Sequence, residues 1–435
     1  MNKLLSPSAL SISSLIEEIE QFQWETKEKI QDYQLQQLFN LLSYHNRHNP
    51  FYSNLLKKGK VKVRANLDLH LKMLPILKRR DIQIIGANFF TKKIPADHSP
   101  ISQVQTSGST GEPVKINKTQ VNSKLWAAYT IREHMWNQRN FGSKLSSIRP
   151  TIDEYIEMDS WGNPVSSFYQ TGAGQGIPIT TPIKEQLRLL KQFSPEVLII
   201  YPNNLKGLID DMRGEGLLLP SIKHIKTVGE TVNDDLRKFT KDFFGIAIED
   251  SYSSQELGTI AIQCPNSGLY HVMSESIMLE VLDKNNEPCK EGEIGRVVVT
   301  DLHNYASPVI RYDIGDYAEA GGSCNCGRNF PTIKRIVGRE RNLITKPDGS
   351  KHWPIFGFHQ FDIVAPIYQY QFVQHSLTLI EMRVFPKRKL TDTDKENLAC
   401  IVKNVLNAPF NIEIVELQEA LQSKAGKFEE FISKV

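Results

Sequence analysis

Apolar residues in the central part of the chain occur either in short continuous runs or at helical spacing. The runs VLIIY at 197–201, HIKTV at 224–228 and IAIED at 246–250 are typical of buried strands, and the first two are followed by stretches with helical periodicity. Strands separated by helices predict a parallel sheet with crossover connections. Between 121 and 135, apolar residues recur every three to four positions, which predicts an amphipathic helix.

The pattern changes on both sides of this region. Residues 1–100 are rich in polar helix formers and predict a helical flank, whereas the runs between 270 and 320 predict β-hairpins. Beyond Gly338, alternating strand and helix patterns predict a compact α+β module. We therefore expect an α/β protein with a large multi-layer N-terminal domain over 1–338, in which 101–338 is the core with parallel sheets and a β-rich subdomain. A small α+β domain should cover 339–435.

Composition narrows the class of protein. The chain has 435 residues, of which 40% are hydrophobic, so it can bury a large core and a second smaller one. A net charge of +3 gives no polybasic field, which argues against nucleic acid as the main partner. No window approaches the roughly 18 apolar residues of a membrane helix, and acidic residues interrupt the N-terminal segment where a signal peptide would lie. The expected location is the cytoplasm, with no membrane contact.

The segment TSGSTGEP at 106–113 is the strongest candidate for ligand chemistry. Its glycines allow backbone conformations in which successive N–H groups point into one concavity, and its hydroxyl groups add donors, so phosphate is the expected guest. The residues concerned are Thr106, Ser107, Gly108, Ser109, Thr110 and Gly111. The Walker pattern is excluded, because Glu and Pro follow the second glycine in place of Lys and Ser or Thr. A polar turn without a ligand is the alternative.

Four further residues form a metal-like set: Cys264, His271, Cys324 and Cys326. Three thiolates and one imidazole are typical of a closed structural zinc site. The alternative is reduced cysteines at a glycine-rich turn, and the C-x-C spacing is less usual than C-x-x-C.

Taken together, the motifs resemble the phenylacetate–CoA ligase branch, which includes CapK-like proteins, of the adenylate-forming superfamily of acyl-CoA synthetases and luciferases. The resemblance covers most of the chain, and its segments occur in the family's order: LPILKRRDI at 74–82, TSGSTGEPVK at 106–115, SPEVLIIYP at 194–202, VGETV at 228–232, EDSYSSQELG at 249–258, SPVIRYDIGD at 307–316, CNCGRNFPTIKRIVGRERNLI at 324–344 and SKAGKF at 423–428.

This resemblance implies an ATP-dependent acid–thiol ligase that forms AMP. The enzyme would activate a carboxylic acid, with an aryl or other apolar acid expected, as an acyl-adenylate. It would then transfer the acyl group to coenzyme A or to the phosphopantetheine thiol of an acyl carrier protein. Two alternatives remain: transfer of the acyl group to an amine or a partner protein, and a nucleotide-binding scaffold without turnover. A homodimer is compatible with the branch.

The resemblance also implies the site residues. Residues 106–111 would cover the ATP phosphates, Glu256 would coordinate Mg²⁺, and Lys427 would be the catalytic cation on a mobile C-terminal domain. Arg341 falls at the usual hinge position. Adenosine contacts are expected from two stretches and two single residues: Gly229, Glu230 and Thr231; Asp250, Ser251 and Tyr252; Asp316; and Arg339. The acyl pocket is expected near Tyr169, Thr171 and Gly172, with Trp161 and Phe168 close by, although these aromatic residues would equally suit a core.

Overall fold

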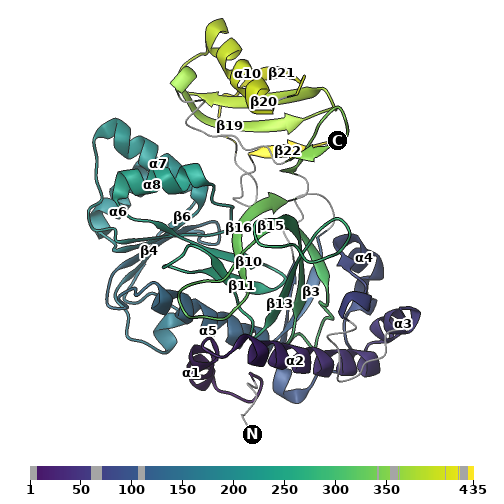
Figure 1. Cartoon of the computed structure of the whole chain (residues 1–435). Coiled ribbons are helices and arrows are strands. Elements are labelled where there is room, and N and C mark those ends of the chain that lie inside the picture. The colour runs from purple at the N-terminus through teal and green to yellow at the C-terminus, as the bar shows by residue number, and fades with distance from the viewer. Residues whose placement is uncertain are drawn as a thin grey trace. The chain divides into compact units, whose positions relative to one another are not determined.

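The computed structural model describes residues 7–59, 71–105, 113–339, 342–352, 361, 363–406, 408–419, 421 and 430–435. The chain divides into two compact units. Figure 1 labels their helices and strands. Unit 1 comprises Met1–Gly142, Ser160–Thr171 and Glu249–Ile336. Unit 2 comprises Ser143–Asp159, Gly172–Ile248 and Val337–Val435. The domain boundary expected after residue 338 stays a prediction, because unit 2 joins the C-terminal residues with two earlier stretches.

Unit 1 begins with helices: α1 (Ile12–Phe22), α2 (Lys27–His48), α3 (Pro50–Lys58), η1 (Leu71–Met73), α4 (Arg79–Ile85), η2 (Gly86–Phe89) and η3 (Ala96–His98). The first three begin at Ser11, Thr26 and Asn49, whose side chains accept hydrogen bonds from backbone N–H groups of the first turn. Caps of this kind fix where each helix starts.

The main sheet of unit 1 has the order β10-β11-β12-β16-β15-β14-β13, with β1 beside β15. Its strands are β1 (Leu77–Lys78), β10 (Ser251–Ser254), β11 (Gly258–Gln263), β12 (Tyr270–Val272), β13 (Ile277–Leu282), β14 (Ile294–Asp301), β15 (Tyr312–Ala320) and β16 (Thr332–Arg339). β13–β14 and β14–β15 pair antiparallel, which confirms the hairpins predicted between 270 and 320. A separate antiparallel hairpin is formed by β2 (Ile101–Gln105) and β3 (Lys115–Thr119).

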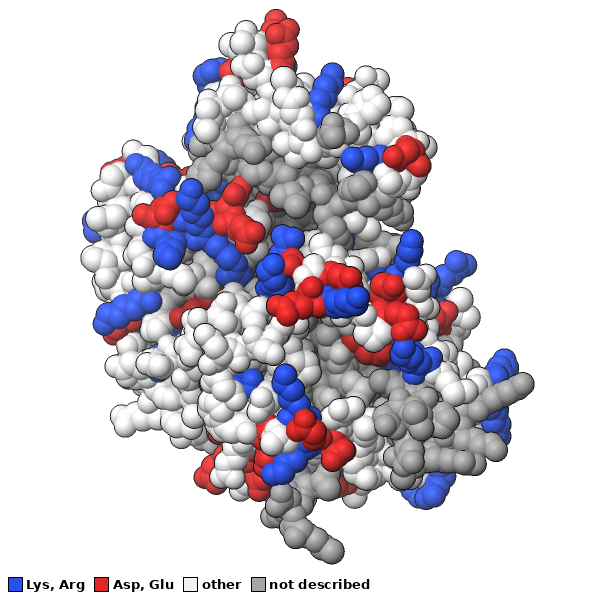
Figure 2. All heavy atoms as spheres, in the orientation of Figure 1, with Lys and Arg blue, Asp and Glu red and all other residues white. Residues whose placement is uncertain are grey.

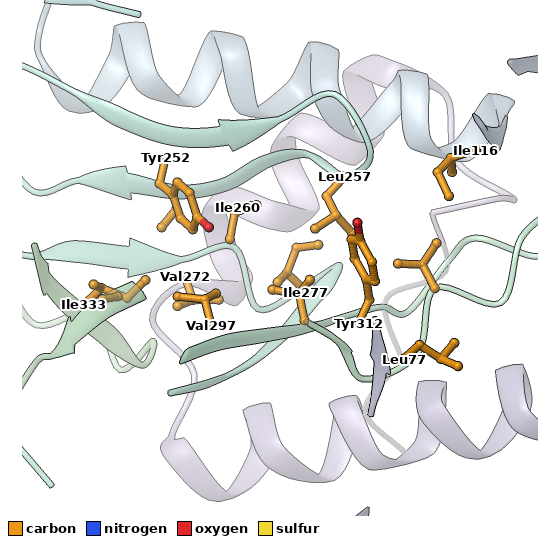
Figure 3. Close-up of a cluster of buried hydrophobic side chains, with 14 of the residues drawn as sticks. Leu77, Ile116, Tyr252, Leu257, Ile260, Val272, Ile277, Val297, Tyr312 and Ile333 are labelled. Atoms are coloured by element: carbon orange, nitrogen blue, oxygen red, sulfur yellow. The ribbon is translucent and has the colours of Figure 1, made fainter. Parts of the chain in front are cut away.

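Apolar side chains of these strands form one buried cluster. Tyr252, Ile260, Val297, Tyr312 and Ile333 belong to it (Figure 3). The cluster fixes β10, which carries Tyr252, against β15, from which Tyr312 projects, and so positions the polar ends of both strands.

Helix α5 (Gln120–Trp136) packs on α1, β3 and β11. The helix predicted between 121 and 135 is therefore present, but its pattern is only partly amphipathic. Met135, expected on the apolar face, is 38% exposed, whereas Arg132 is completely buried. The reason is that α5 has neighbours on several sides, and Arg132 is paired there: Nε lies 2.9 Å from Glu20 Oε1 and Nη2 lies 2.7 Å from Glu275 Oε1.

Unit 2 contains the predicted crossover sheet, with the order β5-β6-β4-β7-β8-β9. Its elements are β4 (Leu145–Arg149), β5 (Ile156–Met158), β6 (Gly174–Pro178), α6 (Ile183–Phe193), β7 (Val197–Ile200), α7 (Pro202–Glu215), β8 (His224–Thr227), α8 (Asp234–Phe244) and β9 (Ile248–Glu249). β6, β4, β7 and β8 run parallel, as strands joined through helices must. The short helix η4 (Val165–Ser167) belongs to unit 1.

The C-terminal residues of unit 2 form a second, smaller sheet with the order β21-β20-β19-β22. Its strands and helix are β19 (Ile367–Gln374), β20 (Leu379–Pro386), α10 (Asp392–Leu406), β21 (Asn411–Glu416) and β22 (Phe431–Ser433), and a short pair, β17 (Ile344–Thr345) and β18 (Lys351–His352), precedes them. The α+β character predicted beyond Gly338 is confirmed, and with it the α/β fold class with several sheets.

Acidic and basic side chains are interspersed on the face drawn in Figure 2, in keeping with the net charge of +3. None of the helices in the described part of the chain combines the length and apolar character needed to cross a bilayer.

Candidate active site

Glu256 lies in the turn that joins β10 to β11. The side-chain oxygen of Ser254 accepts a hydrogen bond from the backbone N–H of Leu257 at 3.2 Å, and Gly258 has a φ of +79°, which favours glycine. Glu256 is only 7% exposed. A tight turn thus holds a buried carboxylate, the kind of hard oxygen ligand that Mg²⁺ accepts together with water and phosphate oxygens.

Tyr252 and Asp316 are brought together by the sheet of unit 1. The Tyr252 hydroxyl on β10 donates a hydrogen bond of 2.7 Å to Oδ2 of Asp316 on β15. Both side chains are buried, and the Tyr252 ring lies among the apolar residues of Figure 3. The hydrogen bond orients the Asp316 carboxylate.

Tyr312 connects this pair with Glu256. Burial raises the pKa of the Tyr312 phenol, and the negative charges of Glu256 and Asp316 act in the same direction. The residues predicted to bind magnesium and ribose, Glu256 and Asp316, therefore both act on the same phenol. Asp250 lies at the start of β10, where its Oδ2 accepts a hydrogen bond of 2.6 Å from the Tyr270 hydroxyl and its Oδ1 accepts one from the Ser251 backbone.

The second predicted adenosine segment, 229–231, belongs to unit 2. Gly229 has a φ of +83°, and a Cβ atom there would lie 2.4 Å from the Tyr201 ring, so this position requires glycine. The Glu230 carboxylate accepts hydrogen bonds from the backbone and side chain of Asn203 at 3.1 and 3.0 Å. Glu230 therefore fixes its own loop to the first turn of α7, and Thr231 beside it is exposed.

The predicted C-terminal residues are only partly described. Arg339 is exposed at the end of β16, and its backbone N–H donates to the Asn342 side chain at 3.1 Å. Arg341, Lys427 and the glycine-rich segment 106–111 lie outside the described residues. Their roles stay predictions.

The region predicted for the acyl pocket contains an aromatic cluster. The Tyr169 ring stacks on Phe141 with centroids 4.6 Å apart, and the Trp161 ring lies 5.7 Å from Phe141 and 5.1 Å from His134. Thr171 holds the loop by accepting a hydrogen bond of 2.9 Å from the Trp161 backbone. Gly172 begins the next stretch of unit 2. The cluster gives this region a rigid apolar wall, and its role in binding an acyl group stays a prediction.

A surface pocket of about 660 Å³ in unit 2 is separate from these residues. It is lined by side chains that include Tyr155, Glu157, Glu185 and Arg188, and it contains none of the predicted site residues.

The candidate metal centre brings Cys264, His271, Cys324 and Cys326 together. Their potential ligand atoms all lie within 4.8 Å of one another, although Cys264 and Cys324 are far apart in sequence. Sγ of Cys264 is 3.8 Å from Sγ of Cys324, and a tetrahedral zinc site with Zn–S bonds of about 2.3 Å places two sulfurs about 3.8 Å apart. Sγ of Cys326 is 3.2 Å from Nε2 of His271.

The protonation of His271 also suits a metal. Burial lowers the pKa of its imidazole to about 4, and the positive charge of Arg328 acts in the same direction. A neutral imidazole is the form that coordinates zinc. Cys264 follows β11, His271 is on β12, and Cys324 and Cys326 lie between β15 and β16, so a metal would join the strands beside the Glu256 turn to the end of the strand that carries Asp316.

One polar residue of this region was not predicted from the sequence. Lys118 on β3 is half-buried, and the carboxylates of Asp301 and Glu256 both raise its pKa, against the larger lowering effect of burial. The sequence could have indicated that Lys118 points inward, because side chains alternate between the two faces of a strand. Lys118 lies on the same face as the buried Val114 and Ile116.

Comparisons with known proteins agree with the motifs. No protein-family model matches the chain. It is 23% identical over 333 residues to the phenylacetate-coenzyme A ligase of Thermus thermophilus, covering 73% of this chain and 72% of the relative. It is also 23% identical over 418 residues to protein CapK of Staphylococcus aureus, covering 89% and 85%.

Solved structures share the fold. A 2-hydroxyisobutyryl-CoA ligase in the postadenylation state matches with a TM-score of 0.74 at 18% identity, covering 94% of this chain and 90% of that one. An anthranilate CoA ligase in complex with anthranoyl-AMP matches with a TM-score of 0.55 at 15% identity, covering 75% and 64%. The resemblance that the motifs predict is thereby confirmed: the chain is similar in sequence to phenylacetate-coenzyme A ligases and CapK, and it shares the fold of these CoA ligases.

Proposed function

We propose that the protein is an AMP-forming ligase that activates a carboxylic acid with ATP and transfers the acyl group to a thiol. The similarity to phenylacetate-coenzyme A ligases supports the reaction class. The observation that carries the proposal is the arrangement of Tyr252, Asp316 and Glu256, since the hydrogen-bonded pair and the buried carboxylate occur together in unit 1.

The first step joins the acid to AMP. A carboxylate oxygen of the acid attacks the α-phosphorus of ATP, and the bond from that phosphorus to the bridging oxygen breaks as pyrophosphate leaves. Asp316 would accept hydrogen bonds from ribose hydroxyls while Tyr252 orients its carboxylate, and the Tyr252 ring would contact adenine. The Lys427 ammonium would offset charge that develops at the α-phosphate.

The second step releases AMP. The sulfur of the acceptor thiol attacks the acyl carbon, the carbon–oxygen bond to phosphate breaks, and the thiol proton passes to the surroundings. Coenzyme A and the phosphopantetheine thiol of a carrier protein are the proposed acceptors, and we place the reaction in the cytoplasm. A homodimer would be compatible with these steps.

Magnesium fits the site because Glu256 is a buried carboxylate in a hydrogen-bonded turn. Bound there, Mg²⁺ would neutralise charge on the leaving pyrophosphate. Glu256 would hold the ion, and water and phosphate oxygens would complete its coordination.

Zinc fits the Cys264, His271, Cys324 and Cys326 set because four donors of the right type lie within 4.8 Å of one another, and the Cys264 and Cys324 sulfurs have the separation of a tetrahedral zinc site. A zinc ion would supply structural cross-linking and no chemistry of the reaction. Metal analysis of the purified protein should give close to one zinc per chain, and much less after gentle purification would contradict this part of the proposal.

Pyrophosphate exchange tests the ligase function. Wild-type protein incubated with MgATP, labelled pyrophosphate and a panel of aryl and aliphatic acids should incorporate label into ATP with at least one acid. Trapping with coenzyme A, carrier proteins or amines then identifies the acceptor. Absence of ATP binding and of exchange with every acid would contradict the proposal.

A further inference from the structure

Lys118 faces inward from the hairpin that contains the glycine-rich segment. β2 and β3 pair antiparallel from Ile101↔Thr119 to Gln105↔Lys115, so residues 106–114 connect the two strands. Along β3, side chains alternate between the two faces of the hairpin. Lys118 shares its face with the buried Val114 and Ile116, whereas Lys115 is exposed.

The ammonium group of Lys118 reaches the turn that holds Glu256. A Cβ atom added to Gly258 would lie 4.0 Å from Lys118 Nζ and 3.9 Å from Cδ1 of Trp126. Gly258 is two residues after Glu256 and begins β11. The side chain therefore extends from the phosphate-loop hairpin to the end of the turn that carries the proposed magnesium ligand.

The negative charges of two carboxylates act on this lysine. Asp301 is buried and held by two hydrogen bonds, from Asn122 Nδ2 at 2.9 Å and from the His303 backbone N–H at 3.1 Å. Glu256 is the second carboxylate whose charge acts on Lys118. Asp301 thus acts as a fixed counter-charge on one side, and an ammonium with three donors can still bind other oxygens.

We propose that Lys118 binds the β- and γ-phosphate oxygens of ATP beside Glu256 and stabilises the pyrophosphate leaving group. The proposal rests on the proposed ligase function. A triphosphate that enters next to the buried Glu256 brings several negative charges to a carboxylate, and a magnesium ion alone leaves part of that charge unbalanced. Lys118 is a half-buried cation at this position, and the negative charge of Asp301 acts on it.

The test compares Lys118→Met and Lys118→Arg with Lys92→Met, which changes an exposed lysine of the same unit. In pyrophosphate exchange at saturating acid, Lys118→Met should lower kcat/KM for MgATP about 10- to 100-fold, the range expected for one lost charge-assisted hydrogen bond. The KM for the acid should stay within about twofold. Lys118→Arg should retain part of the activity, and Lys92→Met should match wild type.

A second readout separates phosphate binding from a purely structural role. Thioester formation from a supplied acyl-adenylate uses no triphosphate, so Lys118→Met should perform this half-reaction at the wild-type rate. Equal losses in both half-reactions, or an unchanged kcat/KM for MgATP, would overturn the proposal. If Lys118→Met does not fold, Lys118→Gln is measured against the same two criteria.

Failure of this proposal differs from failure of the ligase function. Wild-type protein that exchanges pyrophosphate, together with a Lys118→Met variant of unchanged MgATP dependence, would reject the role of Lys118 alone. Wild-type protein without exchange for any acid would reject the ligase function itself.

Discussion

The buried ion pair between Arg132 and Glu275 allows a quantitative prediction about the stability of unit 1. Both side chains are completely buried, with Nη2 of Arg132 2.7 Å from Oε1 of Glu275. Arg132 has a second carboxylate partner in Glu20, 2.9 Å from its Nε, and it also donates to the backbone oxygen of Ile19. One guanidinium therefore ties α5 to α1 and to the segment before β13.

Removing only Arg132 should lower the stability of unit 1 more than removing the charges of both Arg132 and Glu275. In Arg132→Met the Glu275 carboxylate stays buried without a cation, which costs about 3–5 kcal/mol. In Glu275→Gln, Arg132 keeps its ion pair with the partly exposed Glu20, so the loss of stability should be smaller, about 1–3 kcal/mol. The double variant, Arg132→Met with Glu275→Gln, leaves no charge at either of the two buried positions. We therefore expect it to be no less stable than Arg132→Met alone.

Hydrogen exchange of α5 peptides measures this locally, because a chain with two units does not unfold in one step. A loss of 3–5 kcal/mol corresponds to exchange about a hundredfold to several-thousandfold faster in Arg132→Met.

The sign of the pH effect gives a second check. Burial already raises the pKa of Glu275, and loss of Arg132 should raise it further, so the penalty in Arg132→Met should shrink as the pH falls and the carboxyl becomes protonated. Strictly additive losses in the double variant would refute the reasoning.

Three further changes have expected outcomes. Cys324→Ser should lower the zinc content of the purified protein well below one per chain and lower its melting temperature, because a ligand of the closed site is lost. Lys427→Ala should slow adenylate formation by orders of magnitude and leave thioester formation from a supplied acyl-adenylate largely intact. Asp301→Asn should flatten the pH dependence of stability, because Asn does not titrate. Burial raises the Asp301 pKa to about 6, so the protonated carboxyl stabilises the wild type fully below pH 4. The wild type should lose about 3 kcal/mol of unfolding free energy as the pH rises through 6.

Matched controls accompany these variants. Cys400→Ser changes an exposed cysteine and should leave metal content and melting unchanged. Lys424→Ala changes the neighbouring lysine of the same segment and should retain adenylate formation; a loss equal to that of Lys427→Ala would contradict the assignment. For Asp301, hydrogen exchange at pH 5 and pH 7 measures the slope, and an unchanged slope in Asp301→Asn would show that another group is responsible.

Much of the architecture could be predicted because its signals are local. The apolar runs at 197–201 and 224–228 contain β7 and β8, and the helical stretches after them are α7 and α8. Short runs of branched apolar residues bounded by helices leave few alternatives to a parallel sheet.

The site could be predicted only as a set of motifs, because its geometry depends on contacts between distant strands. Tyr252 and Asp316 are 64 positions apart, and no local pattern reveals that their side chains share a hydrogen bond. The Cys264 and Cys324 halves of the metal set were paired through the chemistry of their donors alone. Arg132 and Lys118 were missed because a charged residue in a helix or a short strand normally lies in solvent.

The hydrogen bond between Tyr252 and Asp316 couples the side chain proposed to stack on adenine to the carboxylate proposed to bind the ribose. A substitution of Tyr252 that removes its hydroxyl would also remove the hydrogen bond that orients the Asp316 carboxylate. In engineered variants, the preference for the base and the discrimination between ribose and deoxyribose should therefore change together. An attempt to retarget this enzyme to another nucleotide would have to redesign both strands at once.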